Sequence, residues 1–510
     1  MAAMVACLVP GNVQAQSYRF PWNGYGHDAQ HDAIASVPSQ PINRIVWQTP
    51  VDLNPHYYYY GSNSVLYIHY GSPSITRSNT VIVPVKTGTT GGFEVKALTG
   101  ATGVTNWVQT TDYILPPLPA PPTGWTPPFS TMLTPKNRLY FPGVGGTVYY
   151  CDTPDTTNPS PVIGQIAFYG LANYTANVSA YSNYVFINTP ITSDRYGNIF
   201  FGFQVTGSTP SNLQSGIARI DYNGTGTWVS ATNAASDGGI SGVAVNCAPA
   251  LSNDHKTLYV AVSSGYTGYG YLVALASRTL APLASVRLKD VLTPGNDAYM
   301  TGESSASPTV GPDGDVYYGV LENPLGANHE RGWLLHFNST LTQSKIPGAF
   351  GWDDSASVVS ASLVSSYHGG SPYLLMTKYN NYVEAGGNGV NKIAVLDPQN
   401  TETDPISGAT TMNEVLTIAG PTPDPGNVNA QHPNAVREWC INSAAVDPFT
   451  KSILANNEDG KLYRWDLTSN TLSETNVLTT GIGEAYTPTI VGVDGRVYAI
   501  NNAILFSIGH

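Results

Sequence analysis

Apolar and polar positions along this chain follow a pattern that recurs from its first hundred residues to its end. A short run of small residues, often with Pro, precedes a turn, and an aromatic or aliphatic run follows the turn. The clearest copies are Ser307-Pro-Thr-Val-Gly-Pro-Asp-Gly-Asp-Val-Tyr-Tyr-Gly319 and Thr487-Pro-Thr-Ile-Val-Gly-Val-Asp-Gly-Arg-Val-Tyr-Ala499. Together with related and weaker copies, they place the starts of the units near residues 73, 131, 189, 248, 308, 361, 444 and 488. A repeated supersecondary unit of this kind indicates a repeat architecture.

Each unit is interpreted as four strands. The first strand is short and small, and Asp-Gly pairs such as Asp313-Gly314 suit a tight hairpin to the second strand. Third strands include Phe93–Leu98, Tyr271–Leu275, Lys392–Leu396 and Lys461–Trp465. Fourth strands often carry Trp, as in Gly103–Trp107 and Gly226–Trp228. Four antiparallel strands repeated radially form a β-propeller blade.

The repeat therefore predicts an all-β, eight-bladed β-propeller of four-stranded antiparallel blades. Seven blades, or an array of β-sandwiches, are the alternatives. The last unit ends in a third strand at 503–508, and 43–49 reads as a fourth strand without a unit of its own. Pairing these two segments would close the ring and remove two free sheet edges, which otherwise promote aggregation.

Composition agrees with this architecture and excludes several others. Only 11% of the 510 residues are charged, against a usual share of about 25%. Gly and Pro number 51 and 38, and Tyr numbers 32. The net charge is −12, and no Lys/Arg cluster appears that could neutralise nucleic-acid phosphates. A coiled coil, a disordered chain and a basic nucleic-acid binder are therefore not expected.

The segment Val95-Lys-Ala-Leu-Thr-Gly-Ala-Thr-Gly103 with Trp107, and Leu272-Val-Ala-Leu275, resemble the PQQ-like repeat of quinoprotein alcohol dehydrogenase-like propellers. The lead-in with Trp22, His31 and Ile45-Val-Trp47 is also similar, so the resemblance covers about residues 20–510. It implies a propeller fold. Dehydrogenases of this group carry an adjacent Cys pair beside the quinone, and this chain has none. Bound pyrroloquinoline quinone is therefore not expected, no other cofactor is predicted, and calcium is left open.

The N-terminus and the cysteines bear on the compartment. Residues 2–9 are apolar and Val13-Gln14-Ala15 ends on a small residue, which is typical of the end of a signal peptide over 1–15. A lead-in over 16–42 and one propeller domain over 43–510 would follow. The protein is expected to be secreted, periplasmic or at the cell surface, without a transmembrane segment. Cys151, Cys247 and Cys440 are expected to be buried thiols, with one disulfide as the alternative.

Candidate site residues are those in the loops that surround one mouth of the predicted ring, where side chains from several blades converge. The catalytic candidates His432, Arg437 and Glu438 lie with Trp439 in the longest connection between blades, which could supply a base, an anion clamp and a stacking surface. Ligand-binding candidates are the mouth residues Glu303, Asp353, Trp439 and Glu484, and the loop tyrosines Tyr266 and Tyr379. Structural roles, as strand caps, ion pairs or packed aromatics, are the alternative for each.

These residues support three functions. The first is a binding or surface-interaction module that recognises a carbohydrate or an extracellular protein at the mouth. The second is a secreted lyase or hydrolase with its site at the same mouth. The third is a quinoprotein dehydrogenase. The chain shows no Walker loop, G-x-S-x-G elbow or H-E-x-x-H motif, so the sequence leaves open whether it is an enzyme.

Overall fold

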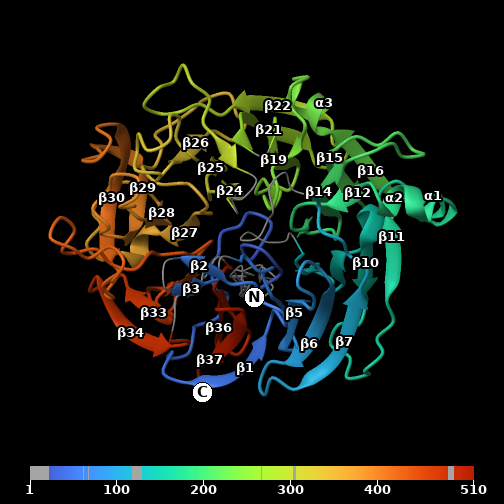
Figure 1. Ribbon diagram of the computed structural model, residues 1–510, viewed down its shortest axis with the longest axis horizontal. Helices are drawn as coiled ribbons and strands as arrows, with labels where there is room; N and C mark the ends of the chain where they lie inside the picture. The colour runs from blue at the N-terminus through green and yellow to red at the C-terminus, as the bar shows by residue number, and fades with distance from the viewer. Residues whose placement is uncertain are drawn as a thin grey trace, which may run out of the picture.

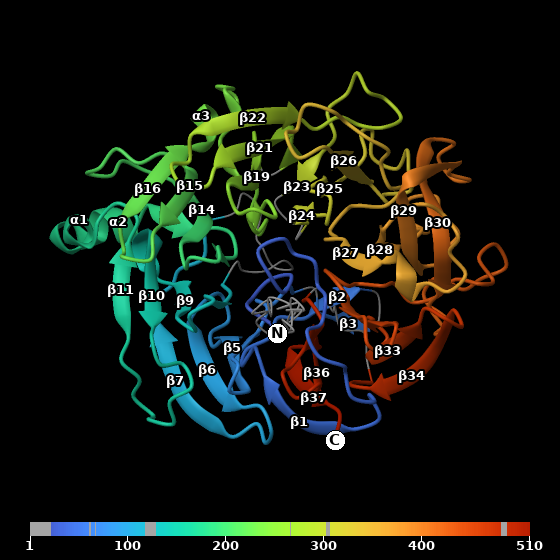
Figure 2. The same ribbon diagram turned by 180° about the vertical axis from the view of Figure 1, so that it is seen from behind.

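Eight antiparallel blades are arranged around a central axis (Figures 1 and 2). This computed structural model describes residues 22–60, 63–66, 68–117, 129–265, 267–301, 306–480 and 487–510. The eight-bladed β-propeller predicted from the repeat is confirmed.

The first four blades, in chain order, contain the following strands: β4 (Ser74–Ile75), β5 (Thr80–Lys86), β6 (Phe93–Thr99) and β7 (Thr105–Thr111) in blade 1; β8 (Met132–Leu133), β9 (Leu139–Pro142), β10 (Thr147–Cys151) and β11 (Gly164–Ala167) in blade 2; β12 (Val185–Ile187), β13 (Thr192–Ser193), β14 (Ile199–Val205), β15 (Gly216–Ile220) and β16 (Gly226–Ser230) in blade 3; β17 (Gly242–Val243), β18 (Ala250–Leu251), β19 (Thr257–Ser263), β21 (Gly270–Ala276) and β22 (Pro282–Arg287) in blade 4.

The second four blades contain these strands: β24 (Thr309–Val310), β25 (Val316–Val320) and β26 (Trp333–Phe337) in blade 5; β27 (Ser357–Ser360), β28 (Tyr373–Tyr379), β29 (Lys392–Thr403) and β30 (Thr410–Ala419) in blade 6; β31 (Ala445–Asp447), β32 (Ser452–Asn456), β33 (Lys461–Asp466) and β34 (Thr471–Val477) in blade 7; β35 (Ile490–Val491), β36 (Val497–Asn501), β37 (Ile504–Ile508) and β1 (Ile45–Pro50) in blade 8. In blade 5, isolated bridges of β26 to residues 344 and 348 stand in for a fourth strand.

Small elements connect and decorate the blades. They are the hairpin β2 (Tyr58–Tyr60) and β3 (Asn63–Val65), the pair β20 (Thr267–Gly268) and β23 (Met300–Thr301), the helices α1 (Leu171–Ala176), α2 (Val178–Ser182) and α3 (Ala231–Ala235), and the 3-10 turns η1 (Val144–Gly146) and η2 (Ala361–Leu363). None of the helices in the described part of the chain is both long and apolar enough to cross a membrane.

The core lies between neighbouring blades, so both faces of the central strands are buried. In β5, Ile82 packs with the core shared with blade 2, whereas Val81 and Val83 pack with the core shared with blade 8. Every residue of β5 is buried. This two-sided burial explains why the second strands read as continuous apolar runs and why few positions remain for charge.

The ring is closed by strands from its two ends. β1 pairs antiparallel with β37, with Trp47 opposite Ser507 and Pro50 opposite Ile504. β1 thus supplies the outer strand of blade 8. Because β1 comes from the start of the chain and β37 from its end, the closure is held by backbone hydrogen bonds and packing.

Two details differ from the sequence-based expectation. The unit placed near residue 361 begins earlier, because its inner strand β27 is Ser357–Ser360 and residue 361 already lies in η2. At the Asp-Gly hairpins only Gly314 (φ 90°) and Gly495 (φ 81°) adopt the left-handed conformation. The turn is a wider one in which Gly311 N–H donates to Asp315 O and Gly314 N–H to Gly311 O.

The N-terminal segment 22–40 lies inside the ring, where Figures 1 and 2 show it in blue. It follows the hairpin ends of the inner strands and accepts their backbone N–H groups in turn: Ile75 donates to Trp22 O, Leu133 to Asn23 O, Leu251 to Ala29 O, Val310 to Gln30 O and Val358 to Asp32 O. It also pairs with Val446 and with Gly495. The segment therefore fills the axis on the face that carries the hairpins, here called the hairpin face.

Candidate functional site

The opposite face, called the mouth face, carries the connections between blades and those between second and third strands. The axis is nearly filled here too. A cavity of about 10 Å³ remains, lined by Tyr25 and by loop residues from six blades, among them His69, Asn246 and Asn442. Such a cavity holds about one water molecule. The axis is therefore a packed centre, and open pockets lie away from it.

A buried group of charged residues surrounds part of this centre. Lys378 Nζ lies 3.7 Å from Asp353 Oδ2, and His69 Nε2 lies 3.8 Å from the same oxygen. Lys378 and Asp353 are both fully buried. Burial raises the pKa of Asp354 to about 8, against the opposing effects of the Lys378 charge and of a hydrogen bond from the Lys378 N–H. Burial and the Lys378 charge lower the pKa of His69 well below its usual range.

Two carboxyl groups and a thiol come together between blades 6 and 7. Glu438, Cys440 and Glu458 each offer an atom within 4.8 Å of the others. Cys440 Sγ lies 3.6 Å from Glu458 Oε2, and Glu438 N–H donates to Glu458 Oε1 at 3.0 Å. Burial and the neighbouring carboxylate raise the pKa of Glu438 well above its usual range, and burial raises the pKa of Glu458 to about 7. A carboxyl group that titrates near neutrality can act as an acid or a base.

The structure brings together only part of the predicted His432, Arg437 and Glu438 group. Arg437 Nη1 lies 3.0 Å from Asp424 Oδ1 and 3.8 Å from Glu458 Oε1, so Arg437 and Glu438 meet at Glu458. His432 N–H instead donates to Asn429 Oδ1 within the 423–436 loop. Among the described residues, no hydrogen bond or ion pair links the His432 ring to the other two. His432 is therefore close to Arg437 and Glu438 in the sequence but is not bonded to the carboxyl pair in the described structure.

The other ligand candidates divide into buried and undescribed ones. Asp353, Trp439 and Tyr379 are at most 4% exposed. Trp439 packs edge-on against Tyr463, which is the structural role given as its alternative. The binding roles of Asp353, Trp439 and Tyr379 remain untested predictions. Tyr266, Glu303 and Glu484 lie outside the described residues.

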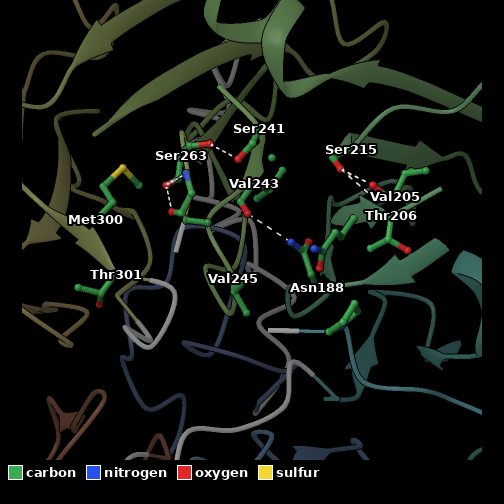
Figure 3. Close-up of a pocket in the computed structure, with 15 residues that line it drawn as sticks. Asn188, Val205, Thr206, Ser215, Ser241, Val243, Val245, Ser263, Met300 and Thr301 are labelled. Carbon is green, nitrogen blue, oxygen red and sulfur yellow. Dashed lines mark hydrogen bonds between the residues drawn. The ribbon is translucent and has the colours of Figure 1, made fainter. Parts of the chain in front are cut away.

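A larger pocket lies between blades 3 and 4 on the mouth face and is called the blade 3–4 pocket. Its volume is about 360 Å³. Figure 3 shows Met300 and Thr301 on one side and Asn188 and Thr206 on the other, with Val243 between them. The described lining consists of Ser, Thr, Asn and Gln with Gly, Ala, Val, Met and Pro, and contains no ionisable side chain.

Three lining atoms of this pocket are buried without a hydrogen-bond partner in the described protein. They are Asn188 Oδ1, Gln204 Oε1 and Thr301 Oγ1. The Asn188 side chain is held in place because its Nδ2 donates to Val243 O at 3.2 Å. Buried polar atoms are normally paired, so three in one pocket mark a place where a polar ligand can bind.

Sequence reasoning missed the blade 3–4 pocket. Its described lining comes from residues between 117 and 301 and contains none of the charged or aromatic residues that attract attention in a sequence. The one available signal was the Asn repeated at inner-strand starts. Asn188, Asn246 and Asn442 recur at these positions, and the bond from Asn188 Nδ2 to Val243 O also fits a structural role.

Neither the axial cavity nor the described lining of the blade 3–4 pocket fits a quinone cofactor. The axial cavity has room for about one water molecule. Pyrroloquinoline quinone carries several carboxyl groups, and the described lining of the blade 3–4 pocket offers no cationic side chain to pair with them. Calcium takes about six to eight oxygen ligands, whereas the Glu438 cluster offers two carboxylates and a thiol. Calcium binding therefore remains an untested prediction.

The three cysteines of the described chain, Cys151, Cys247 and Cys440, are buried, and no disulfide joins any two of them. Burial raises the pKa of Cys247 to about 12. A thiol in this state is a poor nucleophile.

Comparisons with known proteins identify the fold. No protein-family model matches the sequence, and no curated protein sequence does. Among solved structures, a europium-containing methanol dehydrogenase is similar with a TM-score of 0.53 and 9% identity, over 95% of this chain and 89% of that chain. The quinohemoprotein alcohol dehydrogenase from Comamonas testosteroni is similar with a TM-score of 0.53 and 10% identity, over 96% of this chain and 81% of that one. The likeness shows that the chain has the PQQ-like propeller fold.

Proposed function

We propose that this chain is a binding module that holds a neutral carbohydrate in the blade 3–4 pocket. The observation that carries the proposal is the set of three unpartnered polar atoms in a pocket without described ionisable groups. Sugar hydroxyls can donate to the amide oxygens of Asn188 and Gln204 and pair with the Thr301 hydroxyl. The Val, Met and Pro side chains of the lining match the apolar faces of a sugar ring.

Two residues predicted as ligand contacts adjoin this pocket in sequence. Tyr266 follows the lining residue Gly265, and Glu303 is two positions after Thr301. A tyrosine ring provides the apolar, hydrogen-bonding surface that sugars use. The proposal therefore keeps Tyr266 and Glu303 as candidate ligand contacts and does not require Tyr379 or Trp439 to move.

The test is carbohydrate binding by glycan array, followed by calorimetric titration of the sugar that binds best. Gln204→Leu removes the side-chain amide and Thr301→Val removes the hydroxyl, and both changes keep a similar side-chain volume. Each variant is expected to weaken binding about five- to tenfold, because one hydrogen bond is lost in a buried site. Thr468→Val, at an exposed turn of blade 7, is the matched control and should bind as the unmodified protein does.

Two results would contradict the proposal. One is the absence of any carbohydrate ligand on the array. The other is equal affinity in the unmodified protein and in both pocket variants, which would place the sugar elsewhere. Capture of a protein partner that still binds the pocket variants would favour the surface-interaction alternative at another part of the mouth face.

A lyase or hydrolase is the second candidate, favoured by the Glu438–Glu458 pair. Closely spaced carboxyl groups, one of which titrates near neutrality, are an arrangement that supports acid–base catalysis. If the pair is catalytic, Glu438→Gln and Glu458→Gln should each lower polysaccharide turnover at least about a hundredfold. Turnover that is unchanged in both variants would remove the pair as the site.

A further inference from the structure

A second groove lies between blades 3 and 4 on the hairpin face, opposite the blade 3–4 pocket. Its volume is about 520 Å³. It is formed by the first hairpins of the two blades, near residues 194–198 and 252–256, by Arg219 of β15, and by the turn after β21. Its lining differs from that of the mouth-face pocket because it is rich in charge.

The groove gathers cations in a chain that is acidic overall. Arg195, Arg219, Lys256 and Arg278 line it, although the chain has only 22 Lys and Arg in total and a net charge of −12. The two acids beside them, Asp194 and Asp254, leave an excess of two positive charges among the lining residues. A local concentration of positive charge attracts anions.

Both acids are engaged near their own turns. Asp194 Oδ1 accepts the backbone N–H groups of Tyr196 and Asn198, both at 2.9 Å, and its other oxygen accepts Asn198 Nδ2 at 2.6 Å. Asp254 accepts the Ser252 hydroxyl and the Lys256 N–H, and pairs with Lys256 Nζ at 3.1 Å. Neither carboxylate forms an ion pair with an arginine of the groove in the described structure.

The arginines of the groove differ from most arginines elsewhere in the described chain. Six arginines pair with carboxylates: Arg138, Arg287, Arg331, Arg437, Arg464 and Arg496. No such ion pair is present for Arg195, Arg219 or Arg278 within the described residues. In addition, Arg219 Nε is buried and has no hydrogen-bond partner there. Arg219 lines the groove, and a guanidinium group carries several N–H donors that suit an anionic acceptor.

Two further residues shape the site. Burial and the charge of Arg195 lower the pKa of His255, so His255 is neutral at physiological pH. Tyr196 is 58% exposed and lies at the groove with the Arg195 guanidinium 5.2 Å from its ring centre. An exposed tyrosine ring beside arginines offers an apolar surface to the body of a ligand whose anionic end is held by the guanidinium groups.

We propose that this groove binds a tetrahedral oxyanion, a sulfate or phosphate ester, carried on a group of monosaccharide size. Guanidinium groups match the oxygens of sulfate and phosphate with paired N–H donors. A groove of about 520 Å³ is in the range of small-ligand sites and exceeds what a bare oxyanion fills. This groove is on the opposite face from the blade 3–4 pocket, so anion binding can be tested independently of the carbohydrate proposal.

The experiment is calorimetric titration of the full chain with glucose 6-sulfate, glucose 6-phosphate, inorganic sulfate, inorganic phosphate and glucose. The two esters are expected to bind more tightly than the inorganic ions, and glucose to bind at least about tenfold more weakly than either ester. Comparison of the two esters identifies which oxyanion the groove prefers. Affinity should fall as NaCl is raised, because salt screens charges at a partly exposed site.

Arg219→Gln and Arg278→Gln should each weaken ester binding about tenfold or more. Lys451→Gln, an exposed lysine of blade 7, is the matched control and should not change it. Thermal unfolding of all variants checks that the fold is kept, and Arg278→Gln keeps the test valid if Arg219→Gln does not fold. Absence of ester binding, equal binding of glucose, or unchanged affinity in both folded arginine variants would overturn the proposal.

Discussion

Arg331 and Asp404 illustrate what burial does to the few charged residues of this protein. Their side chains are fully buried and lie 2.6 Å apart. Arg331 is in a loop, but that loop folds inward and pairs with the β29–β30 connection. Breaking such a pair leaves an uncompensated buried charge, so these residues are structural.

Glu458 makes the stability of the protein depend on pH. Its pKa is raised in the folded protein from 4.5 to about 7, so the folded state holds its proton more tightly than the unfolded state. The stability associated with this proton is complete below pH about 4.5 and is lost as the pH rises to about 7. We expect the free energy of unfolding to fall over this interval by on the order of 1–3 kcal/mol from this group.

Chemical denaturation between pH 4.5 and 8 measures this effect. Glu458→Gln keeps the acceptor for Glu438 N–H but cannot ionise. The decrease in the free energy of unfolding with rising pH should therefore become smaller. Glu94→Gln, which removes a carboxylate that pairs with Lys96 in blade 1, is the control and should leave this decrease in the free energy of unfolding unchanged. An identical pH dependence in the unmodified protein and in Glu458→Gln would show that Glu458 does not titrate in this range.

At the scale of elements, the strands were predictable and the lead-in was not. Third strands such as Tyr271–Leu275 and Lys461–Trp465 fall within β21 and β33, because their local apolar pattern is decided by two-sided burial. The path of residues 22–40 has no local signal of that kind. Its partners, from Ile75 to Val446, are distant in sequence and are selected only when the blades surround the axis.

The lead-in should be essential for stability. Deleting residues 1–40 removes the acceptors of inner-strand N–H groups at Ile75, Leu133, Leu251, Val310 and Val358. Each buried donor left unpaired costs about 1–3 kcal/mol, so the shortened protein should melt far lower or fail to fold. Deleting residues 1–15 should leave Tm nearly unchanged. Equal Tm for the two deletions, measured by calorimetry, would contradict this role.

At the scale of the whole molecule, the ring depends on one junction between the two ends of the chain. Pairing of 43–49 with 503–508 is found as β1 with β37, and Leu505 lies between Thr49 and Ile500 in that sheet. Every other blade is connected to its neighbours by the chain itself. The junction is therefore the place where a local change acts on the entire propeller.

Leu505→Asp should disrupt the ring as a unit. Leu505 is 1% exposed, and an isolated carboxylate there would cost several kcal/mol. We expect a broad unfolding transition at much lower temperature, in place of one cooperative transition. Leu283→Asp, on the outer strand of blade 4 where Leu283 is 59% exposed, is the control and should keep Tm within a few degrees. Indistinguishable melting of the two variants would show that the junction is not critical.

The sequence by itself determined the blade, because strand pattern, turn residues and two-sided burial are local and repeat along the chain. It also predicted that the blades close into a ring, since the unpaired strands at 43–49 and 503–508 need each other, and it left seven blades as the alternative to eight. Tertiary structure alone decided where ligands can bind. The blade 3–4 pocket is assembled from residues between 117 and 301. The groove on the hairpin face brings together Arg195, Arg219 and Arg278, which come from two separate turns and a strand. Likewise, Arg437 and Glu438 meet Glu458, and His432 does not, because loop paths are set by long-range packing rather than by spacing in the sequence.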